Sequence, residues 1–282
     1  KNVIICYMKY LLYGGEGWIG KKVQKILKKN HEIILGKSRV DNVKDVETEI
    51  ETNKPDRIIC MIGRTHGKGF STIDYLEQKD KLYENIRDNL FGPIVLRELS
   101  NKYRIHTTYL GTGCIFNYDE NHPENTSVGF TEEDIPNFFG SSYSVVKGFT
   151  DRIFHFETPF TLNIRIRMPI SDDNSPRNFI KKITSYEKIC SIPNSMTVLE
   201  DMLPIMIDLS NNQHTGTVNL TNPGFITHNE ILQYYKDIID PNFTWKNFSI
   251  EEQAKILKSD RSNNYLNTEI ITNLYPTVQD IH

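Results

Sequence analysis

The sequence predicts an α/β protein in which a parallel sheet carries helices on both faces, with a smaller lobe towards the C-terminus. Three observations predict this class. Short apolar runs alternate with helical stretches, a glycine cluster follows the first apolar run, and the alternation breaks at 170–195 and again after Pro223. Strands that alternate with helices are typical of βαβ units, whose parallel strands are covered on both faces.

The strands are expected, in chain order, at 10–13, 32–35, 57–62, 107–110, 162–168 and 217–220. The helices are expected at 21–29, 46–52, 83–101 and 200–209. In the first helix, Val23, Ile26 and Leu27 form one apolar stripe and lysines lie opposite. The two segments that break the rhythm are richer in Asn, Pro and aromatic residues, as expected of chain folded over a site.

Composition excludes several classes of partner. The 282 residues carry 33 Lys+Arg and 36 Asp+Glu, a net charge of −3, which gives no reason to expect nucleic acid or an anionic membrane. No apolar run approaches the ~18 residues of a membrane-spanning helix. The four cysteines are scattered without metal-ligand spacing, which predicts free thiols, no metal site and a reducing, cytosol-like compartment.

The glycine cluster reads Gly14-x-x-Gly17-x-x-Gly20, between the first strand and the first helix. In Rossmann-type domains such glycines permit a tight turn, a close approach of the backbone to a pyrophosphate, and close packing of the helix. N–H groups at the helix N-terminus then receive the phosphates. We predict a dinucleotide site here that includes Trp18 and Ile19; a purely structural turn is the alternative.

The residues after the second strand favour NADPH over NADH. An acidic residue at this position would bind the ribose 2′-hydroxyl of NAD. The chain instead has Lys37 and Arg39, which would pair with a 2′-phosphate unless both are solvated loop cations. Gly63, after the strand 57–62, is also expected beside the cofactor.

A phenol and an ammonium are placed one helical turn apart by Tyr143 and Lys147. A nearby cation would lower the pKa of the Tyr143 phenol and make it a proton donor to a developing alkoxide. Tyr75 and Lys79 share the spacing but follow the preceding strand too closely. Thr112, at the end of the strand before Tyr143, can hold a substrate oxygen beside that phenol.

These elements, in this order, resemble the extended short-chain dehydrogenase/reductases, whose structural asparagine Asn89 matches. Longer strings narrow the resemblance to one branch, among them Gly111-Thr112-Gly113-Cys114-Ile115-Phe116, Ile192-Pro193-Asn194-Ser195-Met196-Thr197 and Arg261-Ser262-Asn263-Asn264. They are similar to the bifunctional nucleotide-rhamnose synthases, the 3,5-epimerase/4-keto-reductases known best from plants. The resemblance covers nearly the whole chain from Met8 onward.

The resemblance implies that UDP-4-keto-6-deoxy-D-glucose is converted to UDP-L-rhamnose. The C4 ketone acidifies the protons on C3 and C5, and the family inverts these carbons with a cysteine and a lysine that match Cys114 and Lys182. A neighbouring cation would favour the reactive thiolate. On their own, Cys114 would be interpreted as a small buried filler and Lys182 as a solvated helix lysine.

The remaining roles are implied in the same way. NADPH would reduce C4, Tyr143 would donate the proton, Lys147 would hold the nicotinamide ribose and Thr112 the 4-oxygen. Asn89 is expected among the cofactor-binding residues. The expected substrate contacts are Arg261, at the diphosphate, and the weaker candidates Arg177, Asn178 and Asn263.

The resemblance also divides the chain. An NADP(H)-binding domain is expected at 1–169 and 197–221, and a nucleotide-sugar lobe at 170–196 and 222–282. A separate 4,6-dehydratase would supply the keto-sugar, and a homodimer is an option that the sequence leaves open. It also leaves open whether the carrier is UDP or dTDP.

One stretch departs from the family pattern. After the strand 57–62, Met61 and Arg64 border the cofactor cleft where relatives carry small residues. Three alternatives stay open: a plain 4-keto-reductase, which needs neither Cys114 nor Lys182; a non-catalytic Rossmann-fold regulatory subunit; and a 4-epimerase that retains NAD.

Overall fold

The computed structural model describes residues 7–156 and 159–282, and its centre is a six-stranded sheet whose paired strands are all parallel. Across the sheet the order is β2 (Glu32–Leu35), β1 (Lys9–Tyr13), β3 (Arg57–Cys60), β4 (His106–Thr112), β5 (Thr161–Ile166) and β9 (Gly216–Asn219). This confirms the predicted Rossmann-type class. The order reverses at β1 and β3, and in such sheets ligands bind beyond the carboxyl ends of the strands near that point.

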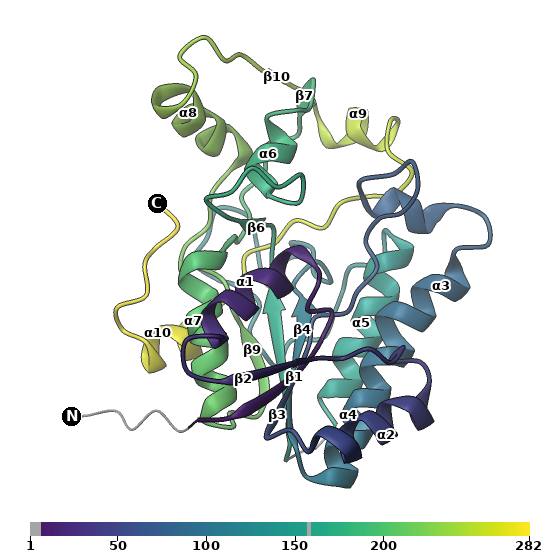
Figure 1. Ribbon diagram of the computed structural model, residues 1–282. Helices are drawn as coiled ribbons and strands as arrows, with labels where there is room; N and C mark the ends of the chain where they lie inside the picture. The colour runs from purple at the N-terminus through teal and green to yellow at the C-terminus, as the bar shows by residue number, and fades with distance from the viewer. Residues whose placement is uncertain (1–6, 157–158) are drawn as a thin grey trace.

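Helices cover both faces of the sheet (Figure 1). One face carries α1 (Trp18–Leu27), α7 (Leu199–Asn211) and α10 (Glu269–Leu274), and the other carries α2 (Val43–Asn53), α4 (Gly92–Tyr103) and α5 (Ser142–Phe154). Leu12 and Ile164 are fully buried on the first face, and Leu11 and Ile58 on the second. The alternation of side chains along buried parallel strands fills two separate cores in this way.

The long helix predicted at 83–101 is interrupted. It runs as α3 (Leu82–Ile86), a π-helical turn η2 (Arg87–Phe91) and then α4. Such π turns are rare and are frequent at functional sites. Here the turn carries Asp88 and Asn89 towards the loop after β3.

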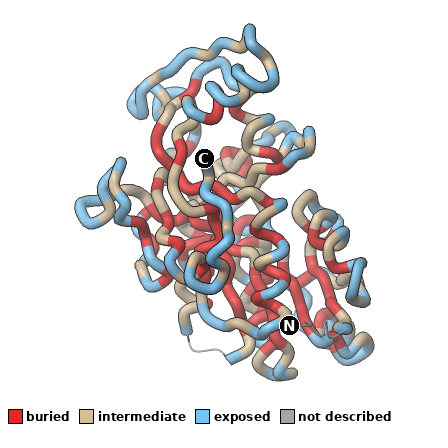
Figure 2. Tube along the Cα trace, turned by 90° about the vertical axis from the view of Figure 1, so that its left-hand side faces the viewer, coloured by how far each residue is buried: buried red, intermediate tan, exposed pale blue. Residues whose placement is uncertain are grey.

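The smaller lobe lies above the carboxyl ends of the sheet strands (Figure 1). Its elements are α6 (Phe179–Ile183), α8 (His228–Ile238), α9 (Ile250–Ala254) and the two-stranded pairs β6 (Pro169–Ile170) with β8 (Thr197–Val198) and β7 (Lys188–Ile189) with β10 (Lys246–Asn247). Ile183, Met196 and Leu232 belong to its own small core. Its outer turns are largely exposed, whereas the strands below are buried (Figure 2).

The C-terminal segment corrects one expected boundary. We expected all of 222–282 in the smaller lobe, but Ile271 of α10 is fully buried in the core that β5, α7 and β9 share. Tyr275 and Val278 pack against that core as well. Apolar side chains therefore return the chain to the sheet after the lobe is complete. Within the described residues, no helix is long and apolar enough to cross a membrane.

Candidate active site

The glycine turn has the geometry that the spacing predicts. Gly14 has φ of +78°, and a Cβ there would lie 2.8 Å from the backbone of Met61 on β3's loop. A Cβ on Gly20 would lie 2.3 Å from the carbonyl oxygen of Gly15, so α1 could not pack against the turn. Gly17 is the N-cap and carries no side-chain cap. The first N–H groups of α1 thus have no side-chain acceptor and can receive an anion.

Trp18 and Lys22 of α1 join the two lobes. The Trp18 indole N–H donates to Asp173 at 2.8 Å, and Lys22 lies 2.8 Å from the same carboxylate. Burial opposes ionisation of Asp173, but the bonds from Lys22 and Trp18 outweigh it and lower its pKa to about 2. The cofactor turn is therefore tied to the loop that begins the smaller lobe. Ile19 packs, half-buried, against the core of the sheet.

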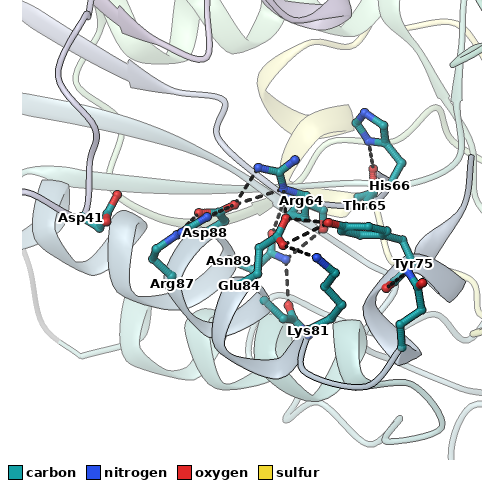
Figure 3. Close-up of polar contacts among 12 residues, drawn as sticks. Asp41, Arg64, Thr65, His66, Tyr75, Lys81, Glu84, Arg87, Asp88 and Asn89 are labelled. Atoms are coloured by element: carbon teal, nitrogen blue, oxygen red, sulfur yellow. Dashed lines mark hydrogen bonds and ion pairs between the residues drawn. The ribbon is translucent and has the colours of Figure 1, made fainter. Parts of the chain in front are cut away.

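Arginines and acids form a network beside the end of β2 (Figure 3). Asp88 is its centre, at 2.8 Å from Arg87, 3.0 Å from Arg64 and 3.6 Å from Arg39. Arg39 also pairs with Asp41 at 3.0 Å. We call this set the edge network; its members are Arg39, Arg64, Arg87, Asp41, Asp88 and Glu84.

Several members of the edge network line a cavity of about 180 Å³, together with Gly63. Lys37 lies nearby with an exposed side chain, and its N–H donates to Glu49 at 2.7 Å. Arg39 is thus near the predicted 2′-phosphate position, but two carboxylates already hold it.

Asn89 is completely buried and binds backbone rather than an open cleft. Its Oδ1 accepts from the N–H of Arg64 at 2.8 Å, and its Nδ2 donates to the Arg64 carbonyl oxygen and to Asn85. Both amide hydrogens are used. Asn89 therefore shapes the loop at Gly63 from behind, as a structural asparagine does, and its expected contact with the cofactor can only be indirect.

Tyr143 and Lys147 both lie on α5, whose N-cap Ser141 accepts from the N–H of Ser144 at 3.0 Å. Lys147 is 4% exposed and donates a hydrogen bond to the hydroxyl of Tyr109 on β4. Burial lowers the pKa of Lys147 to about 8. This ammonium is therefore held by Tyr109 and not by Tyr143.

The expectation that Lys147 lowers the pKa of Tyr143 is not met in this structure. Burial raises the Tyr143 pKa, the nearby Cys114 raises it further, and a hydrogen bond with Thr112 acts in the opposite direction. Tyr143 is consequently a neutral phenol that carries a proton to give. The error came from reading the spacing on α5 alone, because the acceptor for Lys147 comes from the neighbouring strand.

Cys114 lies beside the end of β4, two residues after Thr112. The Thr112 hydroxyl oxygen accepts from the N–H of Cys114 at 3.1 Å, and Ser144 donates to the Cys114 carbonyl oxygen at 2.7 Å. Its Sγ is 3.6 Å from a guanidinium nitrogen of Arg167. Cys114 and Tyr143 line one cavity of about 770 Å³ beneath the smaller lobe.

Lys182 of α6 is not among the residues that line this cavity, but it lies close enough to Cys114 for their charges to interact. Burial lowers the Lys182 pKa, the Arg177 cation lowers it further, and Cys114 acts to raise it. Arg177 contacts the ring of His66, which follows β3. Burial and three nearby cations also lower the pKa of His66, so this ring is neutral near pH 7. We call Thr112, Cys114, Tyr143, Arg167 and Lys182 the cysteine corner.

The expected substrate contacts fall into two groups. Arg261 and Asn263 line the large cavity, and Arg261 donates there to Asp74 of η1 (Ile73–Glu77). Asn178 is instead 4% exposed: it caps α6 through Ile180 N–H and donates to the carbonyl oxygens of Ser171 and Asp173. Every polar atom of its side chain is used, so Asn178 holds a loop and does not face the cavity.

Comparison with known proteins identifies the family. No family model matches the chain. Protein L780 of Acanthamoeba polyphaga mimivirus is 58% identical over 97% of this chain and 95% of its own length. An Arabidopsis thaliana bifunctional dTDP-4-dehydrorhamnose 3,5-epimerase/dTDP-4-dehydrorhamnose reductase is 41% identical over 96% of this chain and 89% of its own. The chain belongs to the bifunctional nucleotide-rhamnose synthases. This confirms the predicted resemblance and the predicted enzyme class.

Solved structures agree with this family. The crystal structure of the L780 UDP-rhamnose synthase matches with a TM-score of 0.95 and 57% identity, over 98% of this chain and 96% of that one. A Bacillus anthracis dTDP-4-dehydrorhamnose reductase in complex with NADP shares the fold, with a TM-score of 0.78 at 16% identity over 98% of this chain and 95% of that one. An Arabidopsis trifunctional enzyme named for dehydratase, epimerase and reductase activities is 40% identical over 97% of this chain but only 40% of its own length.

Sequence reasoning missed several residues of this rhamnose synthase site. Tyr109 lies in a predicted buried strand and Glu49 in a predicted helix, and nothing in the sequence marks either of them as a site residue. Asp74 gave no signal, because its partner Arg261 lies 187 residues away. Arg167 lies 53 residues after Cys114 in the sequence, and only the fold brings its guanidinium beside the Cys114 sulfur.

Proposed function

We propose that this enzyme converts UDP-4-keto-6-deoxy-D-glucose into UDP-L-rhamnose, by inversion at C3 and C5 followed by NADPH-dependent reduction at C4. The observation that carries the proposal is that Cys114 and Tyr143 line one cavity, and that Lys182 lies close enough to Cys114 for their charges to interact. A plain reductase has no use for the cysteine and the lysine. The choice of UDP rests on L780, which is described as a UDP-rhamnose synthase.

Inversion needs acid and base groups near two carbons beside a ketone. A thiolate at Cys114 would take a proton from C3 or C5, and the Thr112 hydroxyl would hold the 4-oxygen on which negative charge develops. Lys182 suits proton exchange, because its lowered pKa brings the neutral and charged forms closer together near pH 7. We assign both residues to the epimerase step.

Reduction needs a cofactor and a proton donor. The glycine turn from Gly14 to Gly20 would hold the pyrophosphate, and the cavity of about 180 Å³ beside Gly63 suits the adenine end. NADPH supplies the hydride for C4 when bound. Tyr143 would donate its proton to the 4-oxygen. The Lys147 ammonium donates one hydrogen to Tyr109, and its other hydrogens would bind the nicotinamide ribose.

Substrate contacts complete the assignment. Arg261 would meet the diphosphate, for which it must share its charge with Asp74, and Asn263 lies beside it on the cavity wall. Arg177 would face the sugar end with His66. These roles make the smaller lobe the nucleotide-sugar lobe, with α10 excluded from it.

The test supplies the purified enzyme with UDP-4-keto-6-deoxy-D-glucose and NADPH and identifies the sugar product by NMR. UDP-L-rhamnose is expected. Cys114→Ala should lose inversion, whereas Cys190→Ala, which changes another cysteine of the same cavity, should keep it. Lys182→Met and its exposed neighbour Lys181→Met form a second matched pair. A C4-reduced sugar with the D configuration would refute the epimerase and leave a plain 4-keto-reductase.

We also propose partners and a location. A separate 4,6-dehydratase would supply the substrate, the activity that the trifunctional relatives carry in their own chain by name. Exposed Leu82 and Tyr83 on α3 and Phe149 on the adjacent α5 form an apolar surface that suits a homodimer. Cys60, Cys114 and Cys190 are free thiols, which supports a reducing cytoplasm.

A further inference from the structure

Arg167 is a buried cation that has only neutral hydrogen-bond partners. It follows β5 and is 1% exposed. Nη1 donates to the Gly113 carbonyl oxygen at 3.2 Å and to the Ser262 hydroxyl at 3.0 Å, and Nη2 donates to the Ser262 carbonyl oxygen at 2.6 Å and to Asn194 Oδ1. No carboxylate among residues 7–156 and 159–282 forms an ion pair with it.

Arg165, two residues earlier, shows the usual alternative. It is 0% exposed, and Asp151 accepts from both its Nε and its Nη2 at 2.8 Å. Buried arginines are normally paired in this way, because an uncompensated charge in the interior is costly. The same strand end thus carries one neutralised and one unneutralised guanidinium. A neutral side chain could meet the same needs for packing and hydrogen bonds, so these needs alone do not explain the charge of Arg167.

Two groups near Arg167 can become negative, Tyr118 and Cys114. Burial raises the pKa of Tyr118, so its phenol stays neutral and the thiol of Cys114 is left to supply the missing charge. Arg167 Nη1 lies 3.6 Å from its Sγ, and Cys114 lines the large cavity where substrate would lie. We infer that Arg167 is the positioning residue that holds Cys114 as a thiolate, with the guanidinium as its fixed counter-ion. The inference deepens the proposed epimerase step and rests on it for its catalytic meaning.

Three other titratable groups face Cys114. Tyr143 and Lys147 come from α5 and Lys182 from α6. The phenol is neutral, because its pKa is raised, and burial lowers the pKa of both lysines, so each loses charge more readily than usual. Burial lowers the pKa of Arg167 as well, but a guanidinium starts from so high a value that it keeps its charge. Arg167 is therefore the cation that stays charged at every pH at which the enzyme works.

The proton transfer balances without a further reactant. As the S–H bond forms, the C–H bond at C3 or C5 breaks and its electron pair moves to the C4 oxygen. The Lys182 ammonium gives a proton to the opposite face of the same carbon, which completes inversion. The proton on Cys114 then passes through solvent to the Lys182 amine, which restores both groups. Loss of the Arg167 charge should lower the thiolate fraction, and so the rate, without removing the base itself.

The experiment follows alkylation of Cys114 by iodoacetamide against pH, in a Cys190→Ala background and without substrate, with the modified peptide identified by mass spectrometry. Free cysteines reach half-maximal reactivity near pH 8.5. Arg167→Gln should raise this midpoint for Cys114 by about 1 pH unit, and Arg167→Lys should restore part of the difference.

Deuterium exchange at C3 and C5 gives the second readout. At pH 7 exchange by Arg167→Gln should fall about tenfold and recover towards pH 9, as the thiol ionises without help. A merely structural arginine would lower exchange equally at both values. Arg165→Lys serves as the matched buried control, and should leave the alkylation midpoint where it was.

Each outcome decides the matter. Equal midpoints with Arg167 and with Gln, or a midpoint moved by Lys182→Met alone, would overturn the inference. If Arg167→Gln does not fold, the profile with Arg167 intact suffices, since a midpoint at or above about 8.5 overturns it too. Alkylation needs no substrate, so a failed product assay beside a shifted midpoint would refute the proposed function and not the role of Arg167.

Discussion

The arginines of the edge network and Arg167 of the cysteine corner differ in how their charge is balanced. In the edge network, Arg39, Arg64 and Arg87 each lie within 3.6 Å of a carboxylate, and their side chains are 25–61% exposed. In the cysteine corner, Arg167 is 1% exposed and has no carboxylate partner among the described residues. Water and counter-ions already stabilise the first group. Arg167 donates hydrogen bonds to neutral groups, but it gains an ionic partner only when an anion forms beside it.

The difference indicates which of these charged residues take part in the reaction. Paired and partly exposed ions contribute little to stability, and their loss is tolerated. A buried cation with no partner is costly, so its retention calls for a function in which negative charge develops nearby. On this argument the cysteine corner should govern rates, and the edge network should contribute only modestly to stability and to cofactor affinity. The predictions that follow test that division.

The largest effect is expected from Lys147→Met. It removes the buried ammonium proposed to hold the nicotinamide ribose, and reduction at C4 should fall by about 10²-fold, the scale expected when a reacting group is misplaced. Thermal stability should change little, since a buried charge is removed together with one hydrogen bond to Tyr109. NADPH oxidation and differential scanning calorimetry measure the two quantities.

Lys102→Met is the matched control, because Lys102 is 61% exposed and pairs with Glu47 on the surface of α4 and α2. It should leave reduction unchanged. A large loss of stability in Lys147→Met, with kcat for reduction retained in the folded fraction, would show that Lys147 serves the fold and does not hold the cofactor.

The next effect is a pH dependence of reduction. The pKa of Lys147 is lowered to about 8, so its ammonium is present below that pH and is lost above it. We expect kcat/KM for reduction to fall about tenfold per pH unit on the alkaline side, because this ratio reports the free enzyme. Deuterium exchange at C3 and C5, which does not need Lys147, should not follow the same curve. Coincident profiles would contradict the separation of roles.

The sequence was sufficient for the parallel sheet, the glycine turn and the pair Tyr143 and Lys147, because local periodicity and spacing determine these features. It failed where partners are distant in the chain. The acceptor of Lys147 is Tyr109, 38 residues earlier, and the guanidinium beside Cys114 comes from Arg167, 53 residues later. Pairings of this kind depend on the register of β3, β4 and β5, which no single segment encodes.

Two buried amides bind backbone groups where the sequence predicts ligand contacts. Asn178 is predicted to contact the substrate, and Asn89, which matches the family's structural asparagine, is also predicted to contact the cofactor. In the structure their amides satisfy buried backbone groups instead. A polar side chain has the same sequence signature in either role, and only the list of its partners separates the two.

A smaller effect is expected from Asp88→Asn, which removes the central charge of the edge network. Stability should fall by about 1–2 kcal/mol at pH 7, since three arginines lose a charged partner. Burial acts to raise the Asp88 pKa, but bonds from Arg87 and Arg64 lower it overall. The stabilisation is therefore present above pH ~4 and lost as the pH falls through the lowered value.

Urea unfolding at pH 7 and at pH 3 measures the difference, with the exposed Asp237→Asn as control. The gap between Asp88→Asn and the unsubstituted enzyme should narrow at the lower pH. Reduction at saturating cofactor should remain within twofold at pH 7. A loss of kcat without a loss of stability would place Asp88 among the catalytic groups and break the comparison.

The smallest effect concerns Arg39 and the choice of cofactor. Its side chain is 61% exposed and shared between Asp41 and Asp88, so a 2′-phosphate must compete with two carboxylates for it. Arg39→Ala should therefore lower the preference for NADPH over NADH by only about fivefold, the equivalent of about 1 kcal/mol for an exposed ion pair.

Asp41→Asn releases Arg39 from one of its two carboxylates and should tighten NADPH binding two- to threefold, while NADH binding stays constant. Titration of cofactor fluorescence measures both constants. If Asp41→Asn weakens NADPH instead, Asp41 positions Arg39 for the phosphate, and the paired arginines of the edge network would be as functionally tuned as the unpaired one beside Cys114.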